Sequence, residues 1–193
     1  MGRVEEAFAA LPREGFLPPD QVRFAGLDAA LPIGYGVTNS QPSTVRAMLA
    51  LLDPRPGDRV LDVGAGSGWT TALLAWLVGP AGRVVAVERI PAVLRFGREN
   101  VTGALLSDGP LAPVEMHPAR RGVLGWPDGA PYDRILVSAG AAAMPDQLVD
   151  QLSPNGVIVA PVAGVMQRLT RHPDGSPPTL ERHGHYVFVP LVE

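Results

Sequence analysis

The chain has 193 residues, which is enough for one sizeable hydrophobic core, and 46% of them are apolar. It contains no Cys, which excludes disulfides, thiolate metal sites and a cysteine nucleophile, and its 16 basic residues are all Arg, which excludes a Schiff-base lysine and a P-loop lysine. The formal net charge of -3 offers no basic surface for nucleic acid.

The first part of the chain predicts two helices separated by an irregular segment. Residues 2–11 place apolar side chains at helical spacing, and Pro12 ends that pattern. Residues 18–41 are rich in Gly and Pro and are expected to be irregular. Pro42 suits the first turn of a helix, and the apolar stripe after it predicts a helix that starts just after Ser40.

From Arg59 onward, apolar runs of strand length alternate with helical patterns. This alternation is typical of parallel strands that are buried on both faces and joined by right-handed crossovers. The tail from Val165, with a turn at HPDGSPP and the ending HYVFVPLV, predicts antiparallel strands at the sheet edge. The expected parallel strands are residues 59–64, 83–88, 112–116, 133–138 and 156–161, and the expected helices are residues 70–79, 92–100 and 146–152.

The segment VLDVGAGSGW, residues 60–69, places three glycines directly after a strand. Glycines are needed where a ligand lies against the backbone, because a Cβ would block both the turn and the approach. Their G-x-G-x-G spacing differs by one residue from the dinucleotide fingerprint G-x-G-x-x-G. Glu88 ends the next strand, where an acid can accept hydrogen bonds from both ribose hydroxyls of an adenosine. Together these features predict a site for S-adenosylmethionine and therefore a methyltransferase.

We expect a Rossmann-like S-adenosylmethionine-dependent methyltransferase fold of the doubly wound α/β class, with a mostly parallel sheet in one domain. Residues 1–57 would form the N-terminal helices and substrate loop, residues 58–162 the donor-binding core, and residues 163–193 the edge strands. The expected contacts to the donor are Asp62, Gly64, Ala65, Gly66, Ser67, Gly68, Glu88, Arg89 and His117.

Three of these residues have other interpretations. Asp62 could instead cap a helix or a turn, and Glu88 could be a solvated acid at a strand end. His117 is included because it ends a strand near the expected adenine position, and it could equally be a turn residue.

Seven segments of the chain resemble the protein-L-isoaspartate O-methyltransferase family, and they span nearly its full length. The most specific is LPIGYG followed by T-x-S-x-P. The segments are RVEEAFAALPREGFLP, LPIGYGVTNSQP, VLDVGAGSGWTTALLA, VVAVERI, GWPDGAPYDRILVSAG, LSPNGVIVAPV and YVFVPLV. The resemblance implies protein repair, in which a carboxylate of an isoaspartyl residue in a protein or peptide is methylated and S-adenosylhomocysteine is released.

The resemblance also implies that Ser40 is the active-site residue, with Thr38, Asn39 and Gln41 in the same substrate loop. A carboxylate is already ionised at pH 7 and needs no base, so Ser40 would orient it. The N-terminus of the helix after Ser40 would favour that anion. The alternative is that Ser40 only caps this helix. Ser138, at a strand end on the same side, is a further substrate candidate.

The chain departs from the family at Val37, where the family usually has Gln, and at Asn39, where it has an apolar residue. In addition, HPARRGVLG stands where the family has an acid that faces the adenine. Two alternatives therefore stay open: a carboxyl methyltransferase for one dedicated peptide, and a binding protein that kept the fold without turnover.

The partners and location follow from what the sequence does not offer. His183 and His185 alternate on an expected strand, but no further ligand completes a metal site, so no metal is expected. Nucleic-acid methylation is disfavoured by the acidic balance and by VSAGAAAMP, which is not an Asn/Asp-Pro-Pro-aromatic loop. We expect a cytoplasmic monomer with neither a nucleic-acid nor a membrane partner, since there is no transmembrane run or export signal.

Overall fold

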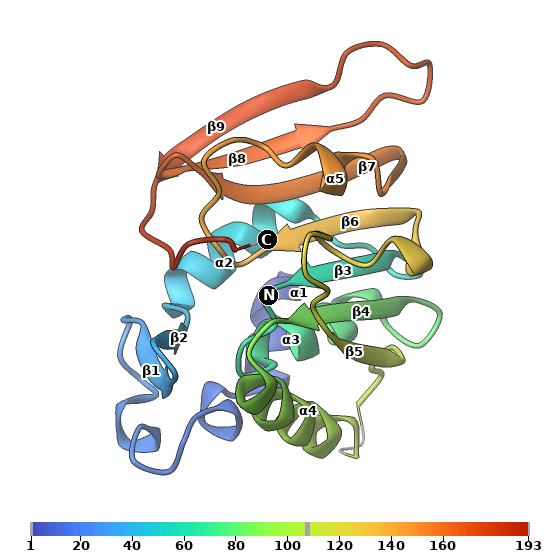
Figure 1. The fold of residues 1–193 in the computed structure, drawn as a ribbon. Helices are drawn as coiled ribbons and strands as arrows, with labels where there is room; N and C mark the ends of the chain where they lie inside the picture. Colours follow the sequence, from blue (N-terminus) through green and yellow to red (C-terminus); the bar gives the residue numbers. More distant parts are fainter. Residues whose placement is uncertain (1, 107–108, 193) are drawn as a thin grey trace.

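The computed structural model describes residues 2–106 and 109–192. Its centre is a seven-stranded sheet with the order β5-β4-β3-β6-β7-β8-β9 (Figure 1). The first five of these strands are parallel, and β8 and β9 continue the sheet antiparallel. The strands are β3 (Arg59–Val63), β4 (Arg83–Glu88), β5 (Val114–Pro118), β6 (Tyr132–Val137), β7 (Leu152–Val162), β8 (Val165–Thr170) and β9 (Thr179–His185). The fold class expected from the sequence is therefore confirmed.

A small two-stranded hairpin precedes the sheet and stands beside it. Its strands, β1 (Leu31–Gly34) and β2 (Val37–Asn39), pair antiparallel. The helices are α1 (Arg3–Ala10), α2 (Pro42–Leu52), α3 (Trp69–Val78), α4 (Pro91–Leu105) and α5 (Asp146–Val149), with 3-10 turns η1 (Arg13–Phe16), η2 (Val22–Phe24) and η3 (Pro127–Gly129). Within the described residues, no helix is both long and apolar enough to cross a bilayer.

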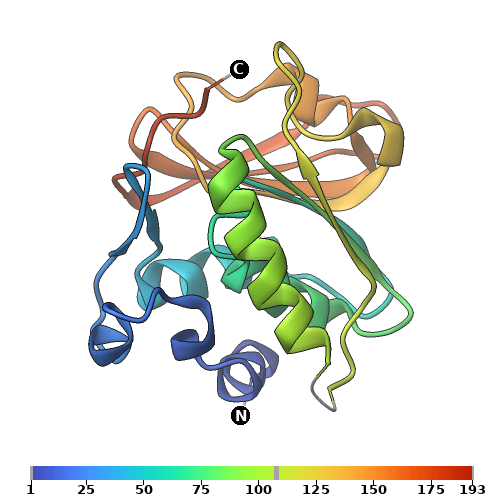
Figure 2. The ribbon, with the colours of Figure 1, turned by 60° about the horizontal axis from the view of Figure 1, so that its bottom comes forward.

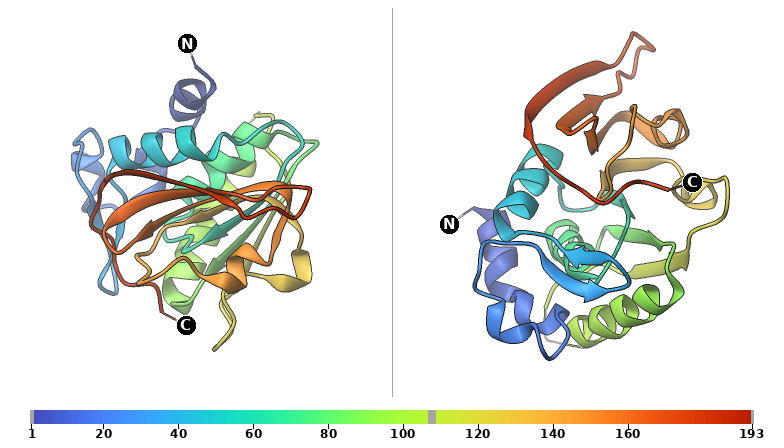
Figure 3. Two further views of the ribbon diagram at one scale, coloured as in Figure 1. Left: turned by 90° about the horizontal axis from the view of Figure 1, so that it is seen from above. Right: turned by 60° about the vertical axis from the view of Figure 1, so that its left-hand side comes forward.

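Helices cover both faces of the sheet, and the face that each covers follows from the alternation of the strand side chains. Val60 and Val84 pack into a core with α1, α2 and α3, whereas their neighbours Leu61 and Val85 pack into a second core with α5. Figure 3 shows α2 and α5 on opposite sides of the sheet. The first core also contains Met166 of β8, so the N-terminal, central and C-terminal segments share one apolar interior.

Helix α3 is apolar almost all round because it is covered on its outer side as well as by the sheet. Helix α1 packs across it, with the rings of Phe8 and Trp69 meeting edge to face at 5.1 Å between centroids. The indole N–H of Trp69 donates to the carbonyl of Leu11 at 3.0 Å. The N-terminal segment is thus anchored on the first turn of α3.

The structure corrects several expected boundaries. The expected helix 146–152 ends at Val149, and β7 already begins at Leu152, where it pairs with Tyr132 before a shift in register. The third strand, expected at residues 112–116, lies two residues later. The segment 18–41, expected to be irregular, contains η2 and the β1–β2 hairpin.

The last segment, expected as an antiparallel edge strand through HYVFVPLV, leaves the sheet after His185. Gly184 has a φ of +38°, and the register with β8 is broken at this point, opposite the first residue of β8, Val165. Residues 186–192 instead return over the carboxyl ends of the parallel strands, where Gly140 donates to the carbonyl of Val189 and accepts from the amide of Leu191. Figure 2 shows this C-terminal tail, the β1–β2 turn and the start of α4 gathered at one end of the molecule.

Candidate active site

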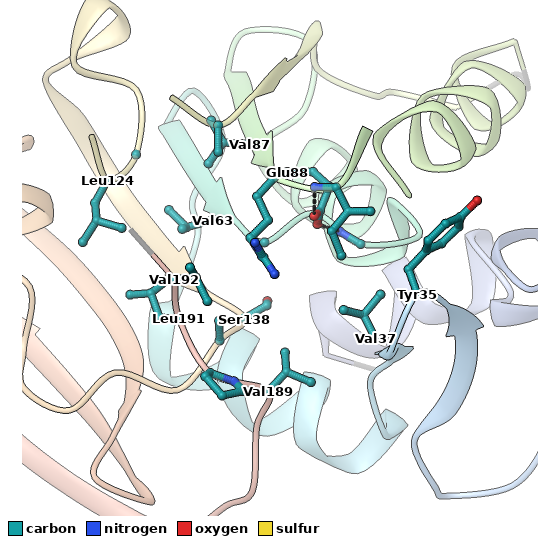
Figure 4. A pocket seen from close by; sticks show the side chains of 18 of the residues that line it. Tyr35, Val37, Val63, Val87, Glu88, Leu124, Ser138, Val189, Leu191 and Val192 are labelled. Atoms are coloured by element: carbon teal, nitrogen blue, oxygen red, sulfur yellow. Dashed lines mark hydrogen bonds between the residues drawn. The ribbon is translucent and has the colours of Figure 1, made fainter. Parts of the chain in front are cut away.

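A cavity of about 560 Å³ opens at the carboxyl ends of the parallel strands. It is lined by the β1–β2 turn, the ends of β3, β4 and β6, the segment after β5 and the C-terminal tail. Figure 4 shows Glu88, Val63 and Ser138 between the hairpin residues Tyr35 and Val37 on one side and Leu124 and the tail on the other. The volume of the cavity lies within the range of roughly 300–1,000 Å³ that is usual for small-molecule sites.

Of the fourteen residues expected in the site, six line this cavity: Thr38, Gly64, Gly66, Glu88, Arg89 and Ser138. The remaining eight, Asn39, Ser40, Gln41, Asp62, Ala65, Ser67, Gly68 and His117, stand behind or beside its wall. No local pattern points to the tail residues 189–192 or to residues 123–125, because the folding of distant segments brings them to the cavity.

The donor loop, residues 64–68, turns sharply from β3 into α3. Its glycines at 64, 66 and 68 all have positive φ, and at Gly68, with φ +82°, an added Cβ would lie 2.8 Å from the carbonyl oxygen of Gly97 in α4. A Cβ on Gly97 would in turn lie 2.6 Å from the carbonyl oxygen of Gly66. Helix α4 and the loop therefore pack backbone to backbone, which only glycine allows.

Glu88 is fixed beside the donor loop by two backbone hydrogen bonds. Its carboxylate accepts from the amide of Gly66 at 3.1 Å and from the amide of Ile90 at 2.9 Å, and its residue is only 7% exposed. An ionised carboxylate has about four acceptor positions, so two remain for a ligand. The geometry suits a diol that approaches from the cavity.

Asp62 lies beneath the donor loop and does not reach the cavity. It is fully buried and accepts a hydrogen bond from the Thr71 hydroxyl at 2.7 Å, while its Oδ1 has no partner within the described residues. Burial raises the pKa of Asp62 to about 6, and the charge of Glu88 adds to the rise. Its expected contact to the donor stays a prediction; what the structure records is a bond that ties β3 to α3.

Ser40 directly precedes α2 but does not cap it. The exposed carboxylate of Asp28 takes that role by accepting from the amide of Ser43 at 2.8 Å and from the side-chain amide of Gln41 at 3.0 Å. These hydrogen bonds, the one to the Ser43 amide foremost, lower the pKa of Asp28. Asp28 takes one backbone amide at this helix N-terminus, and the expectation that the N-terminus also favours a substrate anion stays a prediction. The structure records no hydrogen bond from the Ser40 hydroxyl within the described residues, so this hydroxyl is available to a ligand.

His117 is not among the described residues that line the cavity, and it stacks on Trp126. Their rings stack with centroids 4.0 Å apart, and the guanidinium of Arg120 lies 3.9 Å from the indole centroid. Arg120 also pairs with Asp128 at 2.6 Å. This stack supports the wall formed by residues 119–125, and the expected contact of His117 with the adenine stays a prediction.

The charges around the cavity are mostly positive. Arg89, Arg120 and Arg121 line it, and Glu88 is the one acid among the described lining residues. The tail adds an apolar side through Val189, Leu191 and Val192 (Figure 4). The cavity therefore offers cations, one fixed carboxylate and an apolar wall.

The two histidines of β9 do not follow the regular alternation that would place them on one face of a strand. Gly184, between them, breaks the strand alternation with its positive φ, and His183 lies 3.6 Å from a carboxylate oxygen of Glu181. Among the described residues there is no group of three or more side chains that could hold a metal ion.

Comparisons with known proteins agree on one family. The family model described as Protein-L-isoaspartate(D-aspartate) O-methyltransferase (PCMT) matches residues 1–193. A relative from Aeropyrum pernix, named protein-L-isoaspartate O-methyltransferase, is 46% identical over 195 residues, covering 98% of this chain and 72% of the relative. A relative of the same name from Methanopyrus kandleri is 45% identical over 202 residues, covering 98% of this chain and 83% of the relative.

Solved structures share the fold. A candidate protein-L-isoaspartate O-methyltransferase from Plasmodium falciparum, in complex with S-adenosyl-L-homocysteine, superposes with a TM-score of 0.82 at 24% identity, covering 99% of this chain and 90% of that one. A second structure named protein-L-isoaspartate O-methyltransferase gives a TM-score of 0.84 at 23% identity, covering 100% and 62%. The full-length family match and the close relatives show that this chain belongs to the protein-L-isoaspartate O-methyltransferase family.

Proposed function

We propose that this protein transfers a methyl group from S-adenosylmethionine to the free carboxylate of isoaspartyl residues in proteins and peptides. The observation that carries the proposal is a single cavity that joins the donor loop and Glu88 to the β1–β2 turn and Thr38. Membership of the family and the S-adenosyl-L-homocysteine bound to a structural neighbour support it.

At the donor end, Glu88 is placed to accept hydrogen bonds from the two ribose hydroxyls while it stays tied to Gly66 and Ile90. The donor loop brings backbone rather than side chains to the cavity, so the ligand can approach closely. Residues 119–125 form the far wall, where backbone carbonyls are the groups that can accept from the adenine amino group in place of an acid.

At the acceptor end, Ser40 is the residue we expect to orient the substrate carboxylate. Its hydroxyl is unused by α2, since Asp28 caps that helix. Arg89 and Arg121, both exposed on the cavity wall, supply positive charge for an anionic group. Thr38 and Ser138 are further polar groups on the same cavity, and Tyr35 adds an aromatic side chain at its rim.

The proposed reaction requires alignment more than acid–base chemistry. S-adenosylmethionine supplies a methyl group on a positively charged sulfur; an O–C bond forms to the carboxylate, the S–C bond breaks, and neutral S-adenosylhomocysteine leaves. No proton is transferred, because the carboxylate is already ionised at pH 7. The contribution of this chain is to hold the acceptor in line and to exclude water, and ideal orientation is worth up to about 7–11 kcal/mol.

The test is transfer of labelled methyl to an isoaspartyl peptide and to the same peptide with ordinary aspartate, with Ser40→Ala alongside. We expect base-labile label on the isoaspartyl peptide alone, and a lower rate for Ser40→Ala with unchanged affinity for S-adenosylhomocysteine. Equal labelling of both peptides, or of neither, would overturn the proposal. Label confined to one partner peptide from the same cell would indicate a dedicated substrate instead.

We also propose that the protein acts as a cytoplasmic monomer with neither a nucleic-acid nor a membrane partner. The net charge of -3 opposes binding to a polyanion. Light scattering at assay concentration and cell fractionation test the two statements. A stable dimer, or recovery with membranes, would contradict them.

A further inference from the structure

A buried hydrogen bond joins the two loops of the site. The side-chain amide nitrogen of Asn39 donates to the Ser67 hydroxyl at 2.8 Å, and both residues are only 3% exposed. Asn39 belongs to the acceptor loop, residues 38–41, and directly precedes Ser40. Ser67 belongs to the donor loop and lies between Gly66 and Gly68. The bond therefore spans the two segments between which a methyl group would pass.

Arg13 determines how the Asn39 amide is turned. Its Nε donates to Asn39 Oδ1 at 2.6 Å, and because a guanidinium can only donate, the amide oxygen must face it and the amide nitrogen must face Ser67. Arg13, 4% exposed, also donates to the backbone carbonyls of Asn39 at 3.0 Å and Ser40 at 2.9 Å. The acceptor loop is thus gripped by one buried cation through both its backbone and its side chain.

The donor loop is supported from its other side. The side chain of Asn100 in α4 donates to the carbonyl of Ser67 at 2.9 Å, and Gly97 of the same helix lies against the loop backbone. Ser67 therefore offers the acceptor loop a fixed point of attachment. A change in the bond between Asn39 and Ser67 would move the acceptor loop relative to the donor loop, which stays anchored to α4.

We propose that Asn39 is a positioning residue that sets the distance between the acceptor loop and the donor loop, with Arg13 fixing its orientation and Ser67 receiving it. The proposal rests on the proposed methyl transfer, in which the reacting atoms must lie about 3–3.5 Å apart and in line. Asn39 acts through Ser40 and the donor loop and does not line the cavity itself.

The first test is kinetic, with Asn39→Leu as the variant, since Leu is of similar size and removes both side-chain bonds. We expect kcat to fall about 10- to 100-fold, because a displacement of about 1 Å can cost 10²-fold in rate. The dissociation constant of S-adenosylhomocysteine should change less than about threefold, because the donor loop keeps its own anchors. Ser67→Ala should lower kcat similarly, and the double variant should be no slower than either single one.

Two further variants separate positioning from stability. Leu52→Ala removes a fully buried side chain at the far end of α2 and should lower the melting temperature while kcat of the folded protein stays normal. Asn39→Asp keeps an oxygen toward Arg13 and lets the Ser67 hydroxyl donate to the other, so it should recover most of the rate. A kcat of Asn39→Leu within twofold of the unmodified protein, or a tenfold loss of product affinity, would overturn the proposal.

A second readout does not depend on turnover. In the unmodified protein, S-adenosylhomocysteine should slow hydrogen exchange of the backbone amides of residues 38–45 as well as those of the donor loop. In Asn39→Leu the protection should be confined to the donor loop. If the protein fails to methylate isoaspartyl peptides but S-adenosylhomocysteine still slows exchange at residues 38–45, the proposed function is wrong and the link between the loops stands. If S-adenosylhomocysteine also slows exchange at residues 38–45 in Asn39→Leu, the link is refuted.

Discussion

Replacing Glu88 by Gln tests the donor end of the site most directly. The substitution keeps the size of the side chain but turns one carboxylate oxygen into an NH2 group. Because the two oxygens accept from the amides of Gly66 and Ile90, one of these amides would then face another donor. One of the two positions left for a ribose hydroxyl would also lose its charged acceptor.

The size of the effect follows from these bonds. A hydrogen bond to a charged group contributes about 1.5–3 kcal/mol, and every 1.4 kcal/mol corresponds to tenfold in affinity. We therefore expect Glu88→Gln to weaken binding of S-adenosylhomocysteine about 10- to 150-fold. At saturating donor, kcat should change little, because the ribose hydrogen bonds are the same before and during methyl transfer.

Isothermal titration calorimetry with S-adenosylhomocysteine measures this loss without turnover. Glu115→Gln is the matched control, because Glu115 is an exposed acid on β5 that pairs with Arg83 and does not line the cavity. Its affinity for the ligand should stay within about twofold of the unmodified protein. If Glu88→Gln binds as tightly as the control while its circular dichroism shows a folded protein, Glu88 does not hold the ribose.

Three other substitutions probe the loop, the rim and the buried acid. Gly68→Ala should lower the free energy of unfolding by at least about 1–2 kcal/mol in urea titrations, because φ is +82° at Gly68 and the new Cβ would meet Gly97. The control is Gly103→Ala in α4, which has open space around it and should not destabilise the protein. Tyr35→Ala, at a rim side chain that is 70% exposed, should raise KM for an isoaspartyl peptide about 5- to 30-fold with no change in product affinity; an unchanged KM would remove Tyr35 from the substrate site. Asp62 has a pKa of about 6 in the folded protein and of 3.8 in the unfolded chain. Between these two pH values the folded protein keeps a proton on Asp62 that the unfolded chain releases. The free energy of unfolding should therefore fall by about 3 kcal/mol as the pH rises from 3.8 to about 6. Asp62→Asn cannot titrate and should flatten that dependence; an identical pH profile would contradict the assignment to Asp62.

The parallel core was predictable because its signals are local. The run RVVAVE is apolar at most of its positions, as a buried strand is, and the strand that it predicts, Arg83–Glu88, is the one observed. The donor loop was predictable for the same reason, because its three glycines lie within five residues and all have positive φ in one tight turn. Glu88 followed from its place at the end of the adjacent strand.

The residues that sequence reasoning missed act over long separations in the chain. Arg13 reads as an ordinary surface cation in LPREGF, yet it is buried by carbonyls that lie 14 to 27 residues away. Asp28 gives no local sign that it caps α2, because its partner Ser43 is 15 residues further on. Ser40 adjoins α2 and could therefore cap it by sequence alone. The structure records no hydrogen bond from its hydroxyl within the described residues.

The path of the tail could not be predicted for a related reason. HYVFVPLV has the composition of a strand, but a strand needs a partner, and β8 begins at Val165, opposite His185, so it offers no residue to pair with the tail. The tail finds its hydrogen bonds at Gly140 instead, which places apolar side chains on the cavity. The stacking of His117 on Trp126, nine residues later, could not be predicted either, because nothing in the sequence pairs the two rings.

The chain has a negative net charge, whereas the charges that line the cavity are mostly positive. This difference bears on which anions the protein can bind. The formal charge of -3 opposes a long polyanion, whose phosphates would meet the whole surface. A single peptide carboxylate in the cavity senses mainly the charges within a Debye length of about 8–10 Å. In the proposed complex it would meet Arg89 and Arg121, for which no salt bridge is recorded in the described part of the chain, and one acid, Glu88, that is already engaged by two backbone amides. We propose that an acidic protein selects a small anion in this way and still disfavours a large one.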